Sequence, residues 1–177
     1  MKRQLIWMAC GGMAALALLT GCSDAPAEPS HDRTASPAAS AGQAEAPQSS
    51  KAVVAEQVKT ALEDRLSPDE QRFGSGTGSP CSTSSAVMFT AKCGSAAEAA
   101  GADASFALEQ TERHEGFATL RSVAEKLRTA VTRYQHLGCA DNPAGAATRH
   151  ACLEPAALIA QGFPDLRGGA NLGLRGA

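Results

Sequence analysis

The feature that most constrains the fold of this 177-residue chain is an apolar stripe at helical spacing between residues 117 and 134. Its apolar side chains recur every three or four positions on one face, and arginines and an acid lie among the positions between them. The stripe consists of Phe117, Leu120, Ala124, Leu127, Val131 and Tyr134. Gly138 follows Leu137 as a C-terminal helix cap. The pattern predicts an amphipathic helix that ends at Leu137 and forms the centre of an all-α domain.

Two helical segments are predicted near the start of this domain. Residues 52–66 repeat apolar side chains every three or four positions, which is typical of an amphipathic helix. Ser67 then has the pattern of a new N-cap, because Pro68 occupies the first helical position and Glu70 completes a capping box. The sequence therefore predicts a break at Ser67 and a short second helix that ends by Gly74.

The segment before the central helix gives weaker signals. Residues 87–90 are apolar enough for a short helix or a short strand, and periodicity does not separate the two. Ser95 and Glu98 form a second capping-box pattern. We expect them to open an alanine-rich helix that reaches about Glu112 and is interrupted at Gly101.

Short helices are also predicted after the central helix. Pro155 has the position of a helix start, followed by an apolar helix over residues 156–160 that Gly162 closes. Residues 163–167 begin another turn. Residues 168–177 alternate glycine with leucine, and we expect this tail to pack loosely against the bundle.

A linker separates the domain from the N-terminal segment. Residues 23–50 contain no Leu, Ile, Val, Met or aromatic side chain, and four prolines interrupt them. A segment with so little apolar surface to bury cannot offset the entropy of ordering, so we predict that it is disordered. A flexible chain of this length spans roughly 30 Å on average.

The N-terminal segment has the layout of a signal peptide. Lys2 and Arg3 precede a mostly apolar run over residues 5–19. The run is shorter than the roughly 20 apolar residues that a spanning helix needs, and it has the size of a signal-peptide core. It ends in the tetrapeptide Leu19-Thr20-Gly21-Cys22.

This tetrapeptide resembles the lipobox of bacterial lipoproteins, in which cleavage before the cysteine leaves a diacylated N-terminal residue. The resemblance implies a signal peptide over residues 1–21 and lipidation of Cys22. The Ala-, Gly- and Arg-rich composition resembles that of high-GC bacteria such as actinomycetes. The expected location is therefore extracytoplasmic, on the outer face of the cytoplasmic membrane, with the lipid bilayer as the partner of the acylated Cys22. Two acyl chains are enough for stable anchoring.

The cysteines outside this segment predict disulfides. Cys10 is removed with the signal peptide and Cys22 is lipidated, which leaves Cys81, Cys93, Cys139 and Cys152 in a compartment that permits disulfide bonds. Of the three possible pairings, Cys81–Cys93 and Cys139–Cys152 are favoured because each closes a short loop. Each loop contributes roughly 3 kcal/mol in the chain-entropy model. The expected fold of residues 51–177 is a small helical bundle stapled by two disulfides.

A zinc site is the alternative for part of this set. His136, Cys139, His150 and Cys152 have the ligand types of zinc, but their spacing matches no zinc-finger pattern. The glycine-rich residues 74–80 lack the Gly-Lys-Ser/Thr of a nucleotide-binding loop and the Gly-x-Ser-x-Gly of a nucleophile elbow. The sequence accordingly predicts no metal site, no cofactor and no catalytic residue.

Charge narrows the expected partners. Removal of the signal peptide takes away Lys2, Arg3 and Trp7. The remaining chain has 14 basic and 18 acidic residues, a net charge of −4, and Tyr134 is its one Tyr or Trp. Nucleic-acid binding is therefore not expected. We expect a non-catalytic binding or accessory module of the cell envelope, with an envelope protein or a small ligand as its partner. A metal- or small-ligand-binding lipoprotein and a cell-envelope hydrolase are the alternatives.

Overall fold

The computed structural model describes residues 47–175, and within this range the protein is all-α, as predicted. Two short 3-10 turns and five helices follow one another without a strand in the described part of the chain. The helices are α1 (Pro47–Phe73), α2 (Ala91–Thr111), α3 (Ala118–His136), α4 (Ala146–Ala160) and α5 (Gly162–Gly173). The signal peptide and most of the predicted linker lie outside the described residues.

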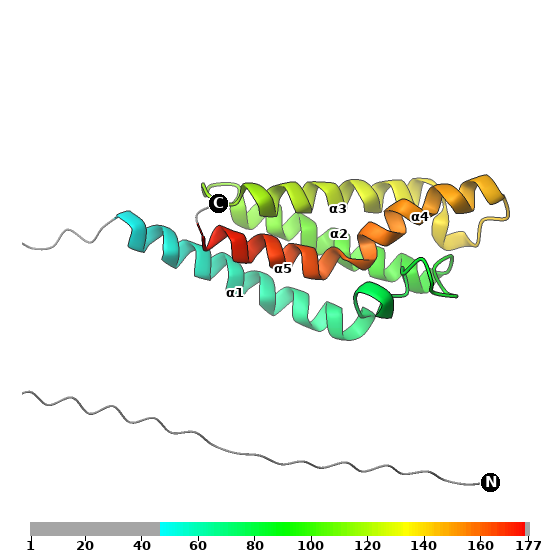
Figure 1. Ribbon diagram of the computed structural model, residues 1–177, viewed down its shortest axis with the longest axis horizontal. Helices are drawn as coiled ribbons and strands as arrows, with labels where there is room; N and C mark the ends of the chain where they lie inside the picture. The colour runs from blue at the N-terminus through cyan, green and yellow to red at the C-terminus, as the bar shows by residue number, and fades with distance from the viewer. Residues whose placement is uncertain (1–46, 176–177) are drawn as a thin grey trace, which may run out of the picture. The chain divides into compact units, whose positions relative to one another are not determined.

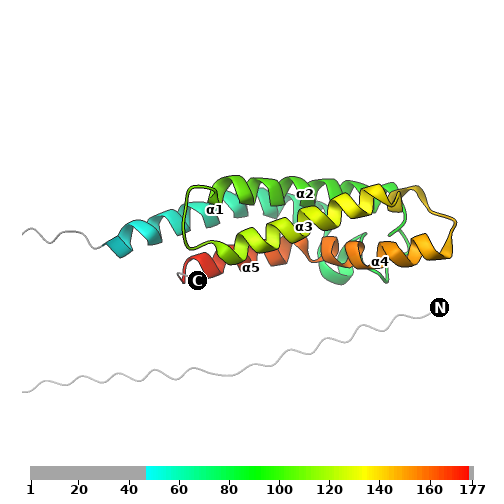
Figure 2. The ribbon, with the colours of Figure 1, turned by 90° about the horizontal axis from the view of Figure 1, so that it is seen from above.

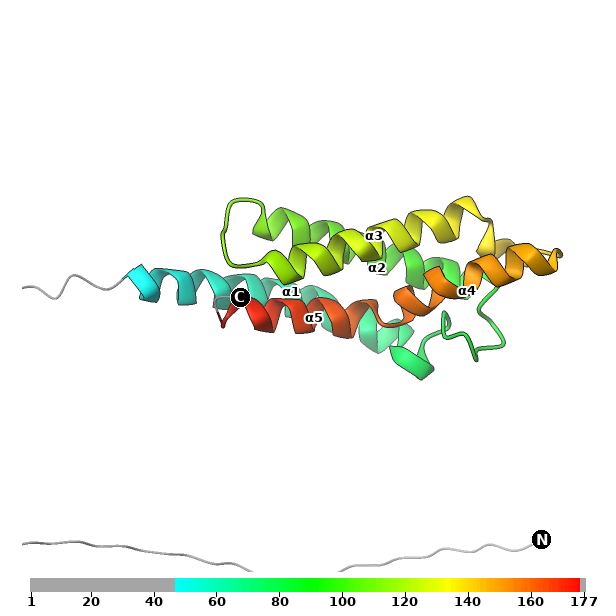
Figure 3. The ribbon, with the colours of Figure 1, turned by 45° about the horizontal axis from the view of Figure 1, so that its top comes forward.

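The helices form an antiparallel bundle of four rods (Figure 1). Helices α1, α2 and α3 are three of the rods. Helices α4 and α5 together make the fourth, which bends at Gln161 between them (Figures 1 and 3). Seen from above, α1 begins and α5 ends at the same end of the bundle, while the α1–α2 and α3–α4 connections lie at the other (Figure 2).

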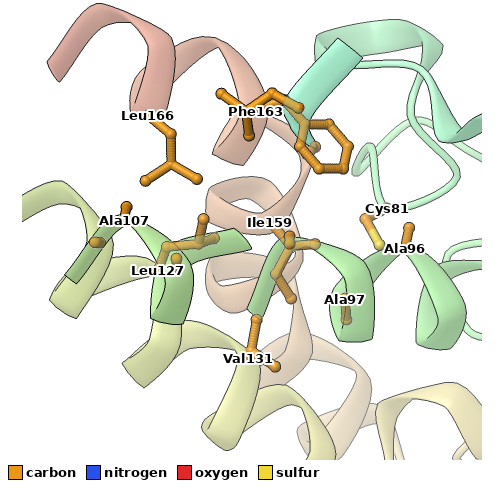
Figure 4. Close-up of a cluster of buried hydrophobic side chains, with 14 of the residues drawn as sticks. Cys81, Ala96, Ala97, Ala107, Leu127, Val131, Ile159, Phe163 and Leu166 are labelled. Atoms are coloured by element: carbon orange, nitrogen blue, oxygen red, sulfur yellow. The ribbon is translucent and has the colours of Figure 1, made fainter. Parts of the chain in front are cut away.

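Helix α3 is the centre of the bundle, and the apolar stripe that predicted it is its buried face. Leu120, Ala124 and Tyr134 have no exposed surface, and Leu127 and Val131 are at most 6% exposed. These side chains join residues of the other helices in one apolar core. Figure 4 shows part of that core, where Ala107, Leu127, Val131, Ile159 and Leu166 lie together.

Glycines of α5 lie against α3 where a larger side chain would not fit. A Cβ atom at Gly169 would lie 2.9 Å from the Cα of Leu120, and one at Gly162 would lie 2.8 Å from a methyl carbon of Leu127. Residues 162–173 are therefore a packed helix, and the expectation of a loosely packed tail from residue 168 was wrong. Gly101 lies inside the continuous α2 and does not interrupt it.

Proline positions are the main departure from the predicted helix starts. Pro68 lies inside the single helix α1, and Pro155 lies inside α4, which begins at Ala146. Ser67 does not act as an N-cap, because its hydroxyl donates to the carboxylate of Glu63 at 2.8 Å. Each proline removes one backbone hydrogen bond, and burial of the apolar face on both sides of it maintains the helix.

Helix boundaries near the linker and the first disulfide also differ from prediction. Helix α1 begins at Pro47, five residues before the predicted start and inside the predicted linker. Helix α2 begins at Ala91 rather than near Ser95, and the Thr90 hydroxyl caps it by accepting the Lys92 N–H at 3.3 Å. Residues 87–90 form hydrogen-bonded turns and are neither helix nor strand.

Candidate functional site

The four cysteines of the domain form two disulfides at one end of the bundle. Cys81 pairs with Cys93 and Cys139 pairs with Cys152, with Cα–Cα distances of 4.8 and 5.9 Å. This is the pairing that loop length favours. The first disulfide ties the α1–α2 connection to the start of α2, and the second ties the α3–α4 connection to α4. We call this end of the bundle the disulfide end.

Three contacts join the two cross-linked segments to each other. The Tyr134 hydroxyl donates to the carbonyl of Met88 at 2.6 Å, and burial raises the pKa of that phenol to about 12, with a smaller contribution from the charge of Asp141. The N–H of Asn142 donates to the carbonyl of Phe89 at 3.0 Å. The Arg149 guanidinium lies 4.0 Å from the centre of the Phe89 ring. The disulfide end is consequently the most cross-linked part of the fold.

The zinc alternative does not match this arrangement. Cys139 and Cys152 are bonded to each other, so neither is a thiolate ligand, and His136 and His150 are exposed. No group of three or more His, Cys, Asp or Glu side chains is placed to hold a metal ion among the residues that the structure describes.

A groove with a volume of about 610 Å³ opens at the disulfide end. Its walls come from the end of α1, the connection that holds Cys81, and the first turns of α2. Arg72 and Lys92 are its two charged lining residues, and neither makes an ion pair with any residue between 50 and 175. Phe73, Pro80 and Val87 supply apolar wall, and the other lining residues are Thr77, Gly78, Ser79, Ser84, Ser85 and Ser95.

Sequence reasoning missed this groove because its residues are spread over 24 positions and carry no motif. The composition of the segment that contains the groove residues gave one indication of a positively charged surface. Residues 71–97 contain Arg72 and Lys92 but no Asp, Glu or His. In a chain with more acidic than basic residues, such a stretch indicates a locally positive surface.

The most unusual ionisable group lies elsewhere, between α1 and α2. Asp103 is 1% exposed, and its Oδ1 accepts a hydrogen bond from the Nε of Arg65 at 2.7 Å. Its Oδ2 has no hydrogen-bond partner. Burial raises the pKa of Asp103 to about 6, because desolvation outweighs the opposing effect of Arg65. The Arg65 guanidinium also lies 5.2 Å from the centre of the Phe106 ring.

A second ionic network joins α5 to α1. Arg167 donates to both carboxylate oxygens of Glu63 at 2.8 and 3.0 Å, and its Nη1 lies 2.9 Å from Glu70. The hydrogen bond from Arg167 is the largest cause of the lowered pKa of Glu63. The hydrogen bond from Ser75 is the largest cause of the lowered pKa of Glu70. These groups are paired with one another, which is typical of structural ion pairs.

No arrangement of nucleophile and base is found in the described part of the chain. His114 is exposed in the α2–α3 connection, and only its backbone is hydrogen-bonded. Its N–H donates to the carbonyl of Thr111 at 3.2 Å, and its carbonyl accepts from Arg121 at 3.0 Å. Between residues 50 and 175, no histidine side chain is hydrogen-bonded to a Ser, Thr or Cys side chain. Because two cations that make no ion pair within the described residues line it and no acid does, the groove at the disulfide end is the candidate functional site.

Comparison with protein-family models, with curated proteins and with solved structures finds no match for this chain. None of the helices between residues 47 and 175 combines the length and the apolar character that a membrane crossing needs. Cys22, the predicted lipidation site, lies outside the described residues.

Proposed function

We propose that this protein is a lipid-anchored lipoprotein of the bacterial cell envelope that acts as a non-catalytic binding module. The proposed anchor is the acylated Cys22, and residues 1–21 are the proposed signal peptide. The tetrapeptide Leu19-Thr20-Gly21-Cys22 and the apolar run before it support this proposal. The proposed location is the outer face of the cytoplasmic membrane.

The observation that carries the binding role is the position of the groove relative to the start of α1. The chain from Cys22 enters the domain at Pro47, and Arg72 lies 25 residues further along the same helix. At a rise of 1.5 Å per residue, this separates the two by about 37 Å along α1. The end of α1 and the start of α2, which line the groove, lie at the end of the bundle opposite the start of α1 (Figure 1). A domain tethered through its N-terminal segment thus has its groove far from the attachment point.

The groove favours a small ligand over a large protein interface. Its volume of about 610 Å³ lies in the range of roughly 300–1,000 Å³ that is typical of small-molecule sites. Large apolar side chains are scarce on the surface. Val53 is the one exposed large hydrophobic residue in the described range. Protein partners commonly need a contiguous apolar patch of several hundred Å². A small-ligand-binding lipoprotein is therefore the form of the proposal that the geometry supports best.

The anchoring part of the proposal is tested with the full chain expressed in a bacterium that processes lipoproteins. We expect the wild-type protein to partition with membranes and to incorporate labelled palmitate. Cys22→Ser should abolish labelling and either release the protein or leave its precursor uncleaved. Cys10→Ser is the matched control, because Cys10 lies inside the proposed signal peptide. Normal processing with membrane retention of Cys22→Ser contradicts the proposed anchor.

A further inference from the structure

The groove at the disulfide end has two positively charged lining residues and no acidic one among the described residues. Arg72 and Lys92 line it, no carboxylate does, and both cations are exposed and free of ion pairs within residues 50–175. Elsewhere in the bundle, Arg65, Arg133 and Arg167 are each paired with an acid at 2.7–2.8 Å. The two groove cations are thus available to an anionic ligand.

A buried hydrogen-bond donor also lines the groove. Ser79 is 4% exposed, and its Oγ accepts the N–H of Cys81 at 3.2 Å. A serine hydroxyl has one hydrogen to donate, and that of Ser79 has no acceptor among the described residues. The Ser79 hydroxyl can therefore donate its hydrogen to an acceptor that a ligand in the groove supplies.

The start of α2 adds to the positive potential. Lys92 lies in the first turn of this helix, which contains no acid. The N-terminus of a helix carries a partial positive charge, so acids are favoured there and a lysine is not. A cation in that position is stabilised when an anion binds beside it.

We propose that this groove binds a phosphate group, carried by an organic phosphate ester or present as free phosphate. Arg72 and Lys92 would supply opposite charge, and the Ser79 hydroxyl would donate to one phosphate oxygen. A phosphate offers more acceptor oxygens than a carboxylate does, which suits a groove with several N–H and O–H donors. The apolar part of the lining, which consists of Phe73, Pro80 and Val87, would contact the organic part of a phosphate ester. Only the envelope location of the ligand rests on the proposed function; the binding chemistry does not.

The test is a titration of the full mature chain in detergent micelles, followed by NMR of backbone amides at constant ionic strength. The probes are inorganic phosphate, glycerol 3-phosphate and acetate. Phosphate and its ester should shift the amides of Ser79 and residues 91–94 with saturation. Tighter binding of the ester assigns an organic phosphate ligand, and equal binding assigns free phosphate. Acetate should bind more weakly at the same amides.

Variants identify the groups that bind. Arg72→Gln and Lys92→Gln should each weaken phosphate binding about tenfold, the effect expected for one charge-assisted hydrogen bond. Lys126→Gln removes an exposed cation on α3 outside the groove and should leave the affinity unchanged. The amide spectrum of each variant serves as the control for folding.

Three results would overturn the proposal. They are the absence of amide shifts with either phosphate probe, acetate binding as tight as phosphate binding, and affinities that neither groove variant changes. None of these bears on the anchor, because the palmitate labelling of Cys22 is measured separately. Failure of the anchor would likewise leave phosphate binding by the domain intact.

Discussion

Asp103→Asn is expected to remove a pH dependence of stability that the wild-type domain carries between about pH 4 and pH 7. Burial of Asp103 raises its pKa from the usual 3.8 to about 6 in the folded protein. Between these values the folded state binds more protons than the unfolded state does. The free energy of unfolding therefore falls as the pH rises through this window, and it levels off above pH 6.

The size of the effect follows from the two pKa values. The full shift corresponds to about 3 kcal/mol, since one pKa unit equals about 1.4 kcal/mol. From pH 5 to pH 7.5, Asp103 should lower the free energy of unfolding by about 1.4 kcal/mol. Asparagine has nearly the same shape and can still accept the hydrogen bond of Arg65 at its Oδ1, but it does not ionise. Its variant should lack this decrease.

Urea unfolding followed by circular dichroism at 222 nm measures the effect at both pH values. Glu63 and Glu70 act in the opposite direction, because their lowered pKa values stabilise the fold as the pH rises towards 4.5, above which their contribution changes little. Their contribution cancels when Asp103→Asn is compared with wild type. Asp64→Asn is the control, because Asp64 is exposed on α1 and makes no ion pair in the described range. An unchanged pH profile in Asp103→Asn would refute the desolvation of this carboxyl.

Other substitutions test the packing and the cross-links. Gly169→Ala should lower the free energy of unfolding by about 1–3 kcal/mol, because its Cβ would lie 2.9 Å from the α3 backbone. Gly168→Ala, in open space, should be neutral or stabilising by up to about 1 kcal/mol, so equal effects in thermal unfolding would contradict the close packing. Replacement of both Cys139 and Cys152 by alanine should cost about 3 kcal/mol in urea unfolding. A thiol label that reacts with the wild-type pair before reduction would contradict the disulfide. Tyr134→Phe should cost about 1–3 kcal/mol, since a buried carbonyl loses its donor, and an unchanged urea midpoint would show that the hydrogen bond is not needed.

The central helix was predictable because its signal is local. The stripe from Phe117 to Tyr134 has a single period over five turns, and one buried face is enough to specify a helix. Gly138 has a φ of +63°, the left-handed conformation that a glycine cap adopts. The all-α fold class follows from several such segments, and the structure confirms it.

Helix starts were less predictable, because capping patterns are also local but weaker than tertiary packing. Ser67 and Pro68 match a helix start, yet α1 continues through them. Burial of Leu62 and Leu66, each at most 1% exposed, stabilises the helix on the preceding turns. Two such side chains contribute about 3–6 kcal/mol, which is enough to offset the roughly 3 kcal/mol cost of an interior proline.

The groove was not predictable from motifs, because it depends on how three segments meet. Arg72 ends one helix and Lys92 begins the next, and the disulfide from Cys81 to Cys93 brings the connection between them against α2. Neither cation stands out in the sequence. What distinguishes them is that no acid of the described range lines the groove with them, which is seen only when their position on the fold is known.

The glycines explain how a chain with so few large side chains builds a specific bundle. From the sequence alone, glycine at positions 101, 162 and 169 predicts breaks in the helices, because a glycine inside a helix costs about 1 kcal/mol relative to alanine. In the fold all three face the large side chains of α3, and Gly169 meets the backbone at Leu120. A large residue on one helix facing glycine on its neighbour lets the helix axes approach closely. Since a shift of α5 by one turn would bring Leu166 or Leu172 opposite Leu120 instead, the same glycines fix the register of the bundle.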